Sequence, residues 1–139
     1  YFALESCEYK RHFLSYQPYY SVILNIDLDH VDYFKDINDV INAYEEFANS
    51  STKMIIANGD DENIRKMNIT KDISYFGLKD NNDIIAKNIE YSKEGIKFDL
   101  VINKENIKTD DKGDKMMPII GIMLFICAIF SCLMSFMTK

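Results

Sequence analysis

The sequence has no glycine-rich phosphate loop. Loops that cradle nucleotide phosphates with backbone amides need several glycines within a few residues. The five glycines of this chain stand apart from one another: Gly59, Gly77, Gly95, Gly113 and Gly121. The chain therefore does not carry such a phosphate site by itself.

Paired cysteines and basic clusters of the nucleic-acid-binding kind are also missing. Three cysteines, an odd number without pairwise spacing, argue against a disulfide framework and favour a reducing, cytoplasmic environment. The net charge is −6, and no basic stripe is present, which argues against nucleic acid as a partner. The sequence shows no signal peptide and begins with Tyr1 rather than Met. We therefore expect a fragment of a longer protein.

What is present suits one α/β domain. With 139 residues, 47% of them hydrophobic and 27% charged, the chain is long enough for a single core with a polar surface. Apolar runs predict a mostly parallel sheet flanked by helices. Alternating apolar and polar residues near the end of this region predict a small antiparallel hairpin. The expected strands are 2–4, 22–26, 53–57 and 73–76, the hairpin arms are 85–91 and 96–102, and helices follow Asp36 (38–49) and the turn 58–61.

Polar side chains follow the first two expected strands. Glu5, Cys7 and Glu8 come after the first, and Asp27, Asp29, His30 and Asp32 come after the second. Because parallel strands end at the same edge of a sheet, these groups are expected to meet there, as in a metal or phosphate site. Cys7 has no second cysteine or histidine at ligand spacing, so we interpret it as a small buried packing residue rather than a ligand or nucleophile.

The same two stretches carry a family resemblance. ESCEYKRHFLSYQP and VILNIDLDHVDYF resemble the central domain of the Mur ligases, and the similarity runs from Tyr1 to about Asn103. The resemblance implies that Glu5 and His30 are catalytic and hold the Mg²⁺ that accompanies ATP. It further implies that substrate is contacted by Glu8, Arg11, His12 and Asn25. For Glu45 it offers a second metal site, whereas a solvated helix face explains the same residue equally well.

The resemblance also implies a reaction. The complete enzyme would activate the carboxylate of UDP-N-acetylmuramate as an acyl phosphate, using ATP, and the amine of L-alanine would then attack it. This step belongs to peptidoglycan synthesis and so to cell-wall formation, cell shape and cell division. By itself, this chain is expected to be inactive, because the family's phosphate loop is absent from it.

The C-terminal part leaves two interpretations open. Residues 1–107 are expected to form the partial central domain, 108–117 a charged linker, and 118–137 an apolar helix. Twenty uncharged residues reach about 30 Å as a helix, enough to span a bilayer. The segment is either the degenerate end of the central domain or a transmembrane helix. The second interpretation predicts a non-enzymatic, membrane-tethered acidic domain instead of a ligase fragment.

Overall fold

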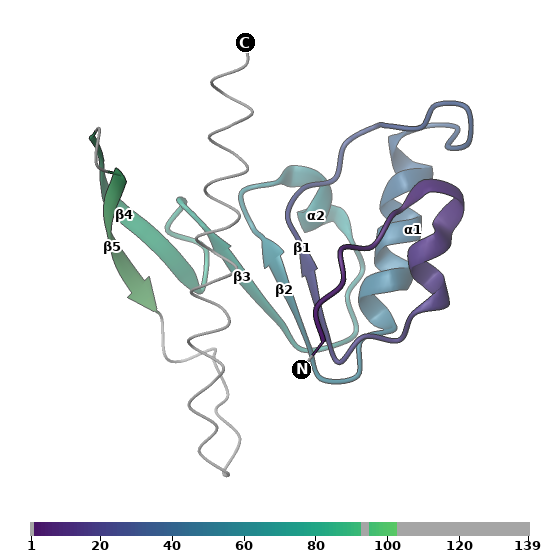
Figure 1. The fold of residues 1–139 in the computed structure, drawn as a ribbon, viewed down its shortest axis with the longest axis horizontal. Coiled ribbons are helices and arrows are strands. Elements are labelled where there is room, and N and C mark those ends of the chain that lie inside the picture. Colours follow the sequence, from purple (N-terminus) through teal and green to yellow (C-terminus); the bar gives the residue numbers. More distant parts are fainter. Residues whose placement is uncertain (1, 93–94, 103–139) are drawn as a thin grey trace.

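The computed structural model describes residues 2–92 and 95–102, which form an α/β fold (Figure 1). Five strands make one sheet in the order β1-β2-β3-β4-β5. The first four are parallel to their neighbours, and only β5 runs antiparallel, paired with β4. The elements are η1 (Tyr9–Ser15), β1 (Tyr20–Ile23), α1 (Ile37–Asn49), β2 (Met54–Asn58), α2 (Glu62–Lys66), β3 (Ile73–Gly77), β4 (Ile84–Ser92) and β5 (Gly95–Ile102).

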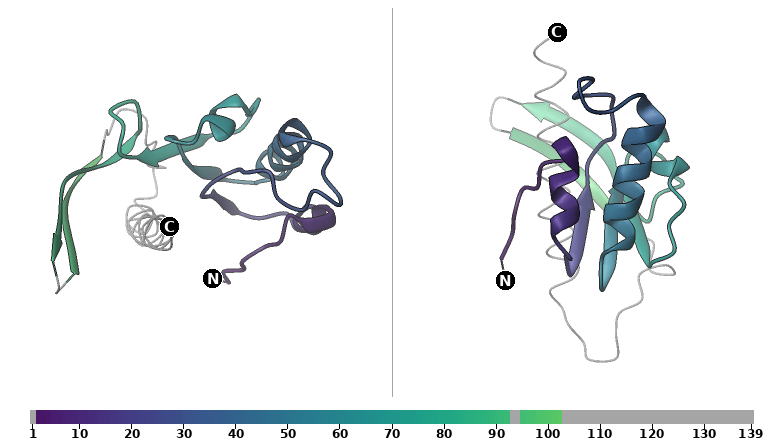
Figure 2. Two further views of the ribbon diagram at one scale, coloured as in Figure 1. Left: turned by 90° about the horizontal axis from the view of Figure 1, so that it is seen from above. Right: turned by 90° about the vertical axis from the view of Figure 1, so that its right-hand side faces the viewer.

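The main core lies between β1–β3 and the helices. Figures 1 and 2 show η1, α1 and α2 together beside β1–β3, with the β4–β5 hairpin at the far end of the sheet. Phe13 of η1 stacks on Phe47 of α1, with ring centroids 4.7 Å apart. Along β2, Ile55 and Ala57 belong to this core, whereas Ile56 belongs to a second cluster. This alternation is the period-two pattern of a strand that is buried on both faces.

The predicted helices and hairpin are confirmed. Asp36 caps α1, and its side chain accepts hydrogen bonds from the backbone N–H groups of Asn38 and Asp39, as an N-cap carboxylate does. Asp61 caps α2 in the same way. β4 and β5 form the expected antiparallel hairpin, with a β-bulge between Lys87 and Glu90. The fold class predicted from the sequence, a mostly parallel sheet with an antiparallel end, is therefore correct.

Two strand predictions near the N-terminus were wrong. Residues 2–8 form no strand, and the side chain of Phe2 is 88% exposed. An apolar run of three residues stabilises a strand only if a neighbouring strand pairs with it, and 2–4 has no such partner among the described residues. β1 covers Tyr20–Ile23 rather than 22–26. Ile26 is nevertheless buried, 2% exposed, because it packs into the main core from a loop.

The connection from β3 to β4 is unusually short for parallel strands. β3 ends at Gly77 and β4 begins at Ile84, yet Phe76 pairs with Ile84 and Gly77 with Ile85. Parallel strands usually need a crossover of about a dozen residues or more. Here the chain turns back at once, and Asp83 pairs with Tyr75 through its backbone N–H and its carboxylate. Only the last two residues of β3 pair with the first two of β4, so the chain has a short distance to return and needs no crossover helix.

The described part of the chain gives no membrane-spanning element. None of its helices is both long and apolar enough to cross a bilayer. The segment 118–137, on which the sequence left two interpretations open, lies outside the described residues. The same holds for the predicted linker at 108–117 and for the domain limit at residue 107.

Candidate functional site

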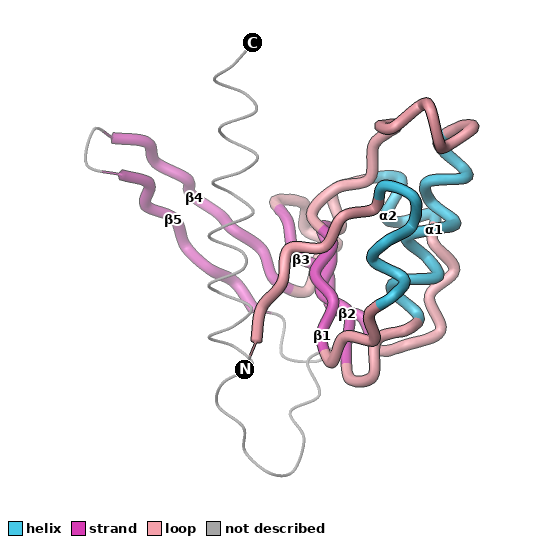
Figure 3. Tube along the Cα trace, turned by 45° about the vertical axis from the view of Figure 1, so that its right-hand side comes forward, coloured by secondary structure: helices cyan, strands magenta, loops and turns pink. Residues whose placement is uncertain are grey.

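The candidate site lies where the segment before η1 meets the loop after β1. Figure 3 shows both segments as loops beside the helices. The first segment carries Cys7 and Glu8, and the second carries His30. Nε2 of His30 lies 3.2 Å from Oε1 of Glu8. The sequence prediction that the two polar stretches meet is thus confirmed for Glu8 and His30.

The loop after β1 is held from α2. The carboxylate of Asp61 accepts a hydrogen bond from the backbone N–H of Ile26 at 3.0 Å. The side-chain amide of Asn63 donates to the carbonyl of Ile26 at 2.9 Å. Both backbone groups of one buried residue are therefore satisfied by the first turn of α2. This arrangement fixes where the loop leaves the sheet, four residues before His30.

His30 itself closes a turn. Its φ of 51° lies in the left-handed region, which costs a non-glycine residue about 1–2 kcal/mol. Its carbonyl accepts hydrogen bonds from the N–H groups of Tyr33 and Phe34, at 2.8 and 3.0 Å. Its own N–H donates to the carboxylate of Asp29 at 2.6 Å. These contacts hold the left-handed conformation and present the imidazole to Glu8.

Tyr9 fixes the imidazole from the other side. The ring of Tyr9 packs against the ring of His30, with centroids 4.7 Å apart. Its hydroxyl donates a 2.7 Å hydrogen bond to the carboxylate of Asp32. This bond lowers the pKa of Asp32 below its usual range, with the nearby His30 and Lys10 acting in the same direction. It also raises the pKa of Tyr9, because the hydroxyl faces a carboxylate.

Cys7 belongs to this cluster, contrary to the prediction that it is a buried packing residue. It is exposed. Its sulfur, a carboxylate oxygen of Glu8 and an imidazole nitrogen of His30 all lie within 4.8 Å of one another. The prediction was wrong because it searched for ligands at short spacing along the chain, whereas the fold supplies His30 from another loop. No short sequence motif contains all three residues.

Glu5, the other predicted metal residue, is exposed and makes no hydrogen bond or ion pair to another described residue. His12 and Asn25, two of the predicted substrate contacts, are also exposed. Among the described residues, the structure brings Glu8 to His30 but gives no contact between Glu5 and His30. The roles implied by the resemblance for Glu5, His12 and Asn25 remain predictions.

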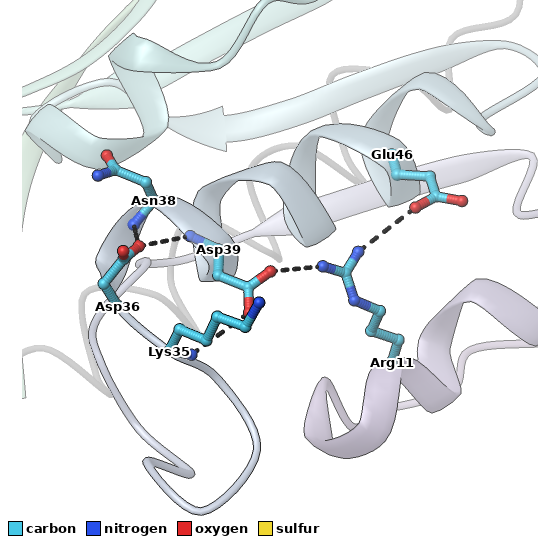
Figure 4. Close-up of polar contacts among 6 residues, drawn as sticks. All are labelled: Arg11, Lys35, Asp36, Asn38, Asp39 and Glu46. Atoms are coloured by element: carbon cyan, nitrogen blue, oxygen red, sulfur yellow. Dashed lines mark hydrogen bonds and ion pairs between the residues drawn. The ribbon is translucent and has the colours of Figure 1, made fainter.

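Arg11, the remaining predicted substrate contact, is bound to α1. Its guanidinium lies 2.8 Å from the carboxylate of Asp39 and 3.5 Å from that of Glu46 (Figure 4). Lys10 and Arg11 both have left-handed backbone conformations, with φ of 52° and 58°. The two ion pairs join η1 to α1 and compensate part of that backbone strain. The backbone N–H of Arg11 donates to the carbonyl of Glu8 at 2.7 Å, which keeps η1 next to the candidate site.

Glu45 has a structural contact of its own. Its carboxylate accepts a 2.7 Å hydrogen bond from the backbone N–H of Asn68, in the connection between α2 and β3. Neither interpretation of Glu45, as part of a solvated helix face or as a ligand of a second metal, predicted this contact. The sequence offered no signal for it, because the two residues are separated by a whole strand and a helix.

A second polar cluster, defined by Asp60, Arg65 and Asn82, lies at the ends of β2 and β3. Asp60 accepts hydrogen bonds from the N–H groups of Leu78 and Lys79 and from the Asn82 side chain, at 2.6, 3.2 and 2.8 Å. Arg65 donates to Asn82 at 2.7 Å and lies over the ring of Tyr75. The helix expected after the turn 58–61 is present as α2, capped by Asp61, but this network was not predicted.

Comparison with known proteins identifies the fold. Residues 1–120 match the Mur ligase middle domain family. The structure resembles that of the UDP-N-acetylmuramate:L-alanyl-gamma-D-glutamyl-meso-diaminopimelate ligase from Neisseria meningitides, at 20% identity and a TM-score of 0.54, over 66% of this chain and 28% of that one. It also resembles a UDP-N-acetylmuramoyl-L-alanyl-D-glutamate–2,6-diaminopimelate ligase, at 18% identity and a TM-score of 0.54, over 90% of this chain and 28% of that one.

These likenesses show the fold, and this chain spans less than a third of the length of either ligase. The family match covers the candidate site, including both loops that form it. It also covers the whole sheet from β1 to β5. On this match, the chain belongs to the Mur ligase family and represents its middle domain.

Proposed function

We propose that this chain is the central part of an ATP- and Mg²⁺-dependent ligase that joins L-alanine to UDP-N-acetylmuramate in the cytoplasm. The family membership supports ligase chemistry in peptidoglycan synthesis. The choice of L-alanine rests on the two sequence blocks around Glu5–Pro18 and Val22–Phe34. The observation that carries the proposal is the meeting of those two blocks in space, at Glu8 and His30.

The residues present fit a magnesium site in part. Mg²⁺ prefers carboxylate oxygens together with water and phosphate. Glu8 supplies a carboxylate beside His30, and the exposed Glu5 lies three residues before it on the same segment. We assign Glu5 and His30 to the metal, with Glu8 orienting the imidazole. Mg²⁺ in this position would stabilise the negative charge that develops during phosphoryl transfer.

The other residues have binding and orienting roles in this proposal. Arg11 is held by Asp39 and Glu46 close to the segment that carries Glu8. A guanidinium suits the carboxylate or the phosphates of the muramoyl nucleotide, since it presents paired donors in one plane. His12 and Asn25 are exposed and accessible to the same substrate. The β- and γ-phosphates of ATP need a loop that this sequence does not contain.

The proposal is tested with the complete ligase and with this chain alone. The complete ligase should release phosphate from ATP only when UDP-N-acetylmuramate and L-alanine are both present. D-Glutamate and diaminopimelate, the next residues of such peptides, should not replace L-alanine. The 139-residue chain should show no ATP turnover above a Glu5→Ala control, because nothing in it cradles the phosphates. Ligation of another amino acid in preference to L-alanine would overturn the proposed substrate.

A further inference from the structure

We propose that Cys7, Glu8 and His30 form a binding site for a thiophilic divalent ion, with Zn²⁺ as the natural occupant. The three side chains offer one sulfur, one oxygen and one nitrogen, and these atoms lie within 4.8 Å of one another. This inference does not need the ligase reaction, since it rests on the geometry of the three residues. It shares the ligand His30 with the magnesium site proposed above, and it uses as a ligand Glu8, which orients the imidazole in that site.

The spacing suits a small four-coordinate ion. In a tetrahedral zinc site with Zn–S near 2.3 Å and Zn–N near 2.0 Å, the ligand atoms lie about 3.3–3.6 Å apart. Nε2 of His30 and Oε1 of Glu8 are already 3.2 Å apart. Cys7 is exposed, and a change of its rotamer would bring the sulfur to the remaining corner. Three protein ligands leave the fourth position for water.

The backbone and the ring contacts hold the ligands in place. The carbonyl of Cys7 accepts a hydrogen bond from the N–H of Phe13 at 3.0 Å, and that of Glu8 accepts one from Arg11 at 2.7 Å. Tyr9 of η1 packs against the ring of His30 on the other loop, and its hydroxyl donates a hydrogen bond to Asp32 of that loop. Contacts of this kind around metal ligands are typically worth 10–100-fold in metal affinity. The site is therefore largely formed before an ion binds.

The ligand set selects the metal. Mg²⁺ takes hard oxygen ligands and does not favour a thiolate, whereas Zn²⁺ and Co²⁺ bind sulfur and imidazole well. Binding releases the thiol proton of Cys7 to solvent as the sulfur–metal bond forms, so affinity should rise with pH. An ion held in this way occupies the His30 nitrogen. Zinc and the proposed magnesium site therefore compete for one imidazole.

The experiment is a Co²⁺ titration of the full chain, followed by displacement with Zn²⁺. The background variant carries Cys127→Ser and Cys132→Ser, so that Cys7 is the one remaining thiol. We expect one Co²⁺ per chain, an ultraviolet charge-transfer band typical of sulfur ligation, and complete loss of that band when Zn²⁺ is added. Cys7→Ser should abolish the band. Glu8→Gln and His30→Ala should each weaken Co²⁺ binding by about tenfold or more.

Glu62→Gln is the matched control, because Glu62 is an exposed carboxylate of α2 that lies outside the triad. Its Co²⁺ affinity should stay within about twofold of the background variant, the size of an ordinary indirect effect. A charge-transfer band that survives Cys7→Ser would overturn the proposal, and so would Co²⁺ binding that responds to Glu62→Gln as strongly as to Glu8→Gln. Failure of the ligase assay would leave these results unchanged, so the two proposals fail separately.

Discussion

The two polar clusters of the molecule differ in how their hydrogen-bonding groups are used. Around Asp60, Arg65 and Asn82, every one of the three side chains bonds to protein groups that hold the β3–β4 connection. Around Cys7, Glu8 and His30, the donors and ligand atoms converge on one another and stay partly accessible. The first cluster holds the short β3–β4 connection in place. The side chains of the second cluster do not hold a connection between strands in this way, although neighbouring residues such as Tyr9 and Asp29 hold His30 in position.

The difference shows what separates a structural network from a candidate site on the same fold. Both clusters lie at the ends of neighbouring strands, where ligands usually bind in parallel sheets. Position alone therefore does not distinguish them. The two clusters differ in how far the hydrogen-bonding capacity of their side chains is already used. Buried polar groups that already have protein partners have little capacity left for a ligand. By this criterion we place the candidate site at His30 rather than at Asp60.

The largest expected effect is on catalysis. In the complete ligase, His30→Ala and Glu5→Gln should each lower kcat by about 10²–10³, equivalent to roughly 3–4 kcal/mol, because an electrostatic contact to the transition state is lost. Phosphate release across a Mg²⁺ titration measures this, and high Mg²⁺ should partly restore the rate. Melting temperature is the control. If kcat falls only in proportion to the loss of thermal stability, both residues have a structural role. The His30 cluster would then not differ in function from the Asp60 cluster.

The next effect concerns stability. Asn82→Ala should lower the free energy of unfolding by about 1–3 kcal/mol, because Asp60 and Arg65 each lose a buried partner. Asn81→Ala is the matched control: its side chain is exposed, and only its backbone carbonyl bonds to Arg65. Urea unfolding of both variants gives the comparison. Equal stability of the two would show that the Asp60 network is dispensable.

Gly77→Ala should also lower the free energy of unfolding, because Gly77 lies next to this network. A Cβ added at Gly77 would lie 2.5 Å from the Asn82 amide nitrogen and 2.6 Å from the Asp60 carboxylate. Both neighbours are tied into the short β3–β4 connection and cannot move away without losing hydrogen bonds. Overpacking of this kind typically costs about 1–3 kcal/mol. The β3–β4 connection therefore leaves no room for a side chain at Gly77.

The smallest effect is a shift in titration. Tyr9→Phe should raise the pKa of Asp32 toward its ordinary value, because the hydroxyl that stabilises the carboxylate is removed. A lowered pKa contributes stability above the ordinary value and loses it as the pH falls through the lowered one. The acid side of the stability curve should therefore flatten slightly in the variant. Carboxyl NMR measures the pKa, with Tyr16→Phe, an exposed tyrosine, as control. An unchanged Asp32 titration would contradict the role given to Tyr9.

Periodicity and capping residues predicted most of the fold. The helix expected at 38–49 after Asp36 matches α1, which begins at Ile37 and ends at Asn49. The expected strand at 2–4 failed because a strand needs a partner, and pairing is a property of the whole sheet rather than of a short run. The exposed position of Phe2 makes the same point.

The site was predictable only in outline. Polar residues after Ile23 indicated an edge with ligand groups, and the family resemblance added His30. The partner of His30 could not be chosen among Glu5, Cys7 and Glu8, because adjacent residues point in different directions according to backbone angles. Here the left-handed conformations of Lys10 and Arg11 just after Glu8 set the course of that segment. Such conformations in non-glycine residues have no reliable signature in a sequence.

The order of the strands has a consequence for how the protein is made. Every hydrogen-bonded pair in the sheet joins strands that are consecutive along the chain, from β1 to β5. Among the described residues, no later strand has to be inserted between two earlier ones. On a ribosome, each of these strands can therefore dock onto a neighbour that has already emerged. The described part of the sheet can thus form in the order in which its strands are synthesised.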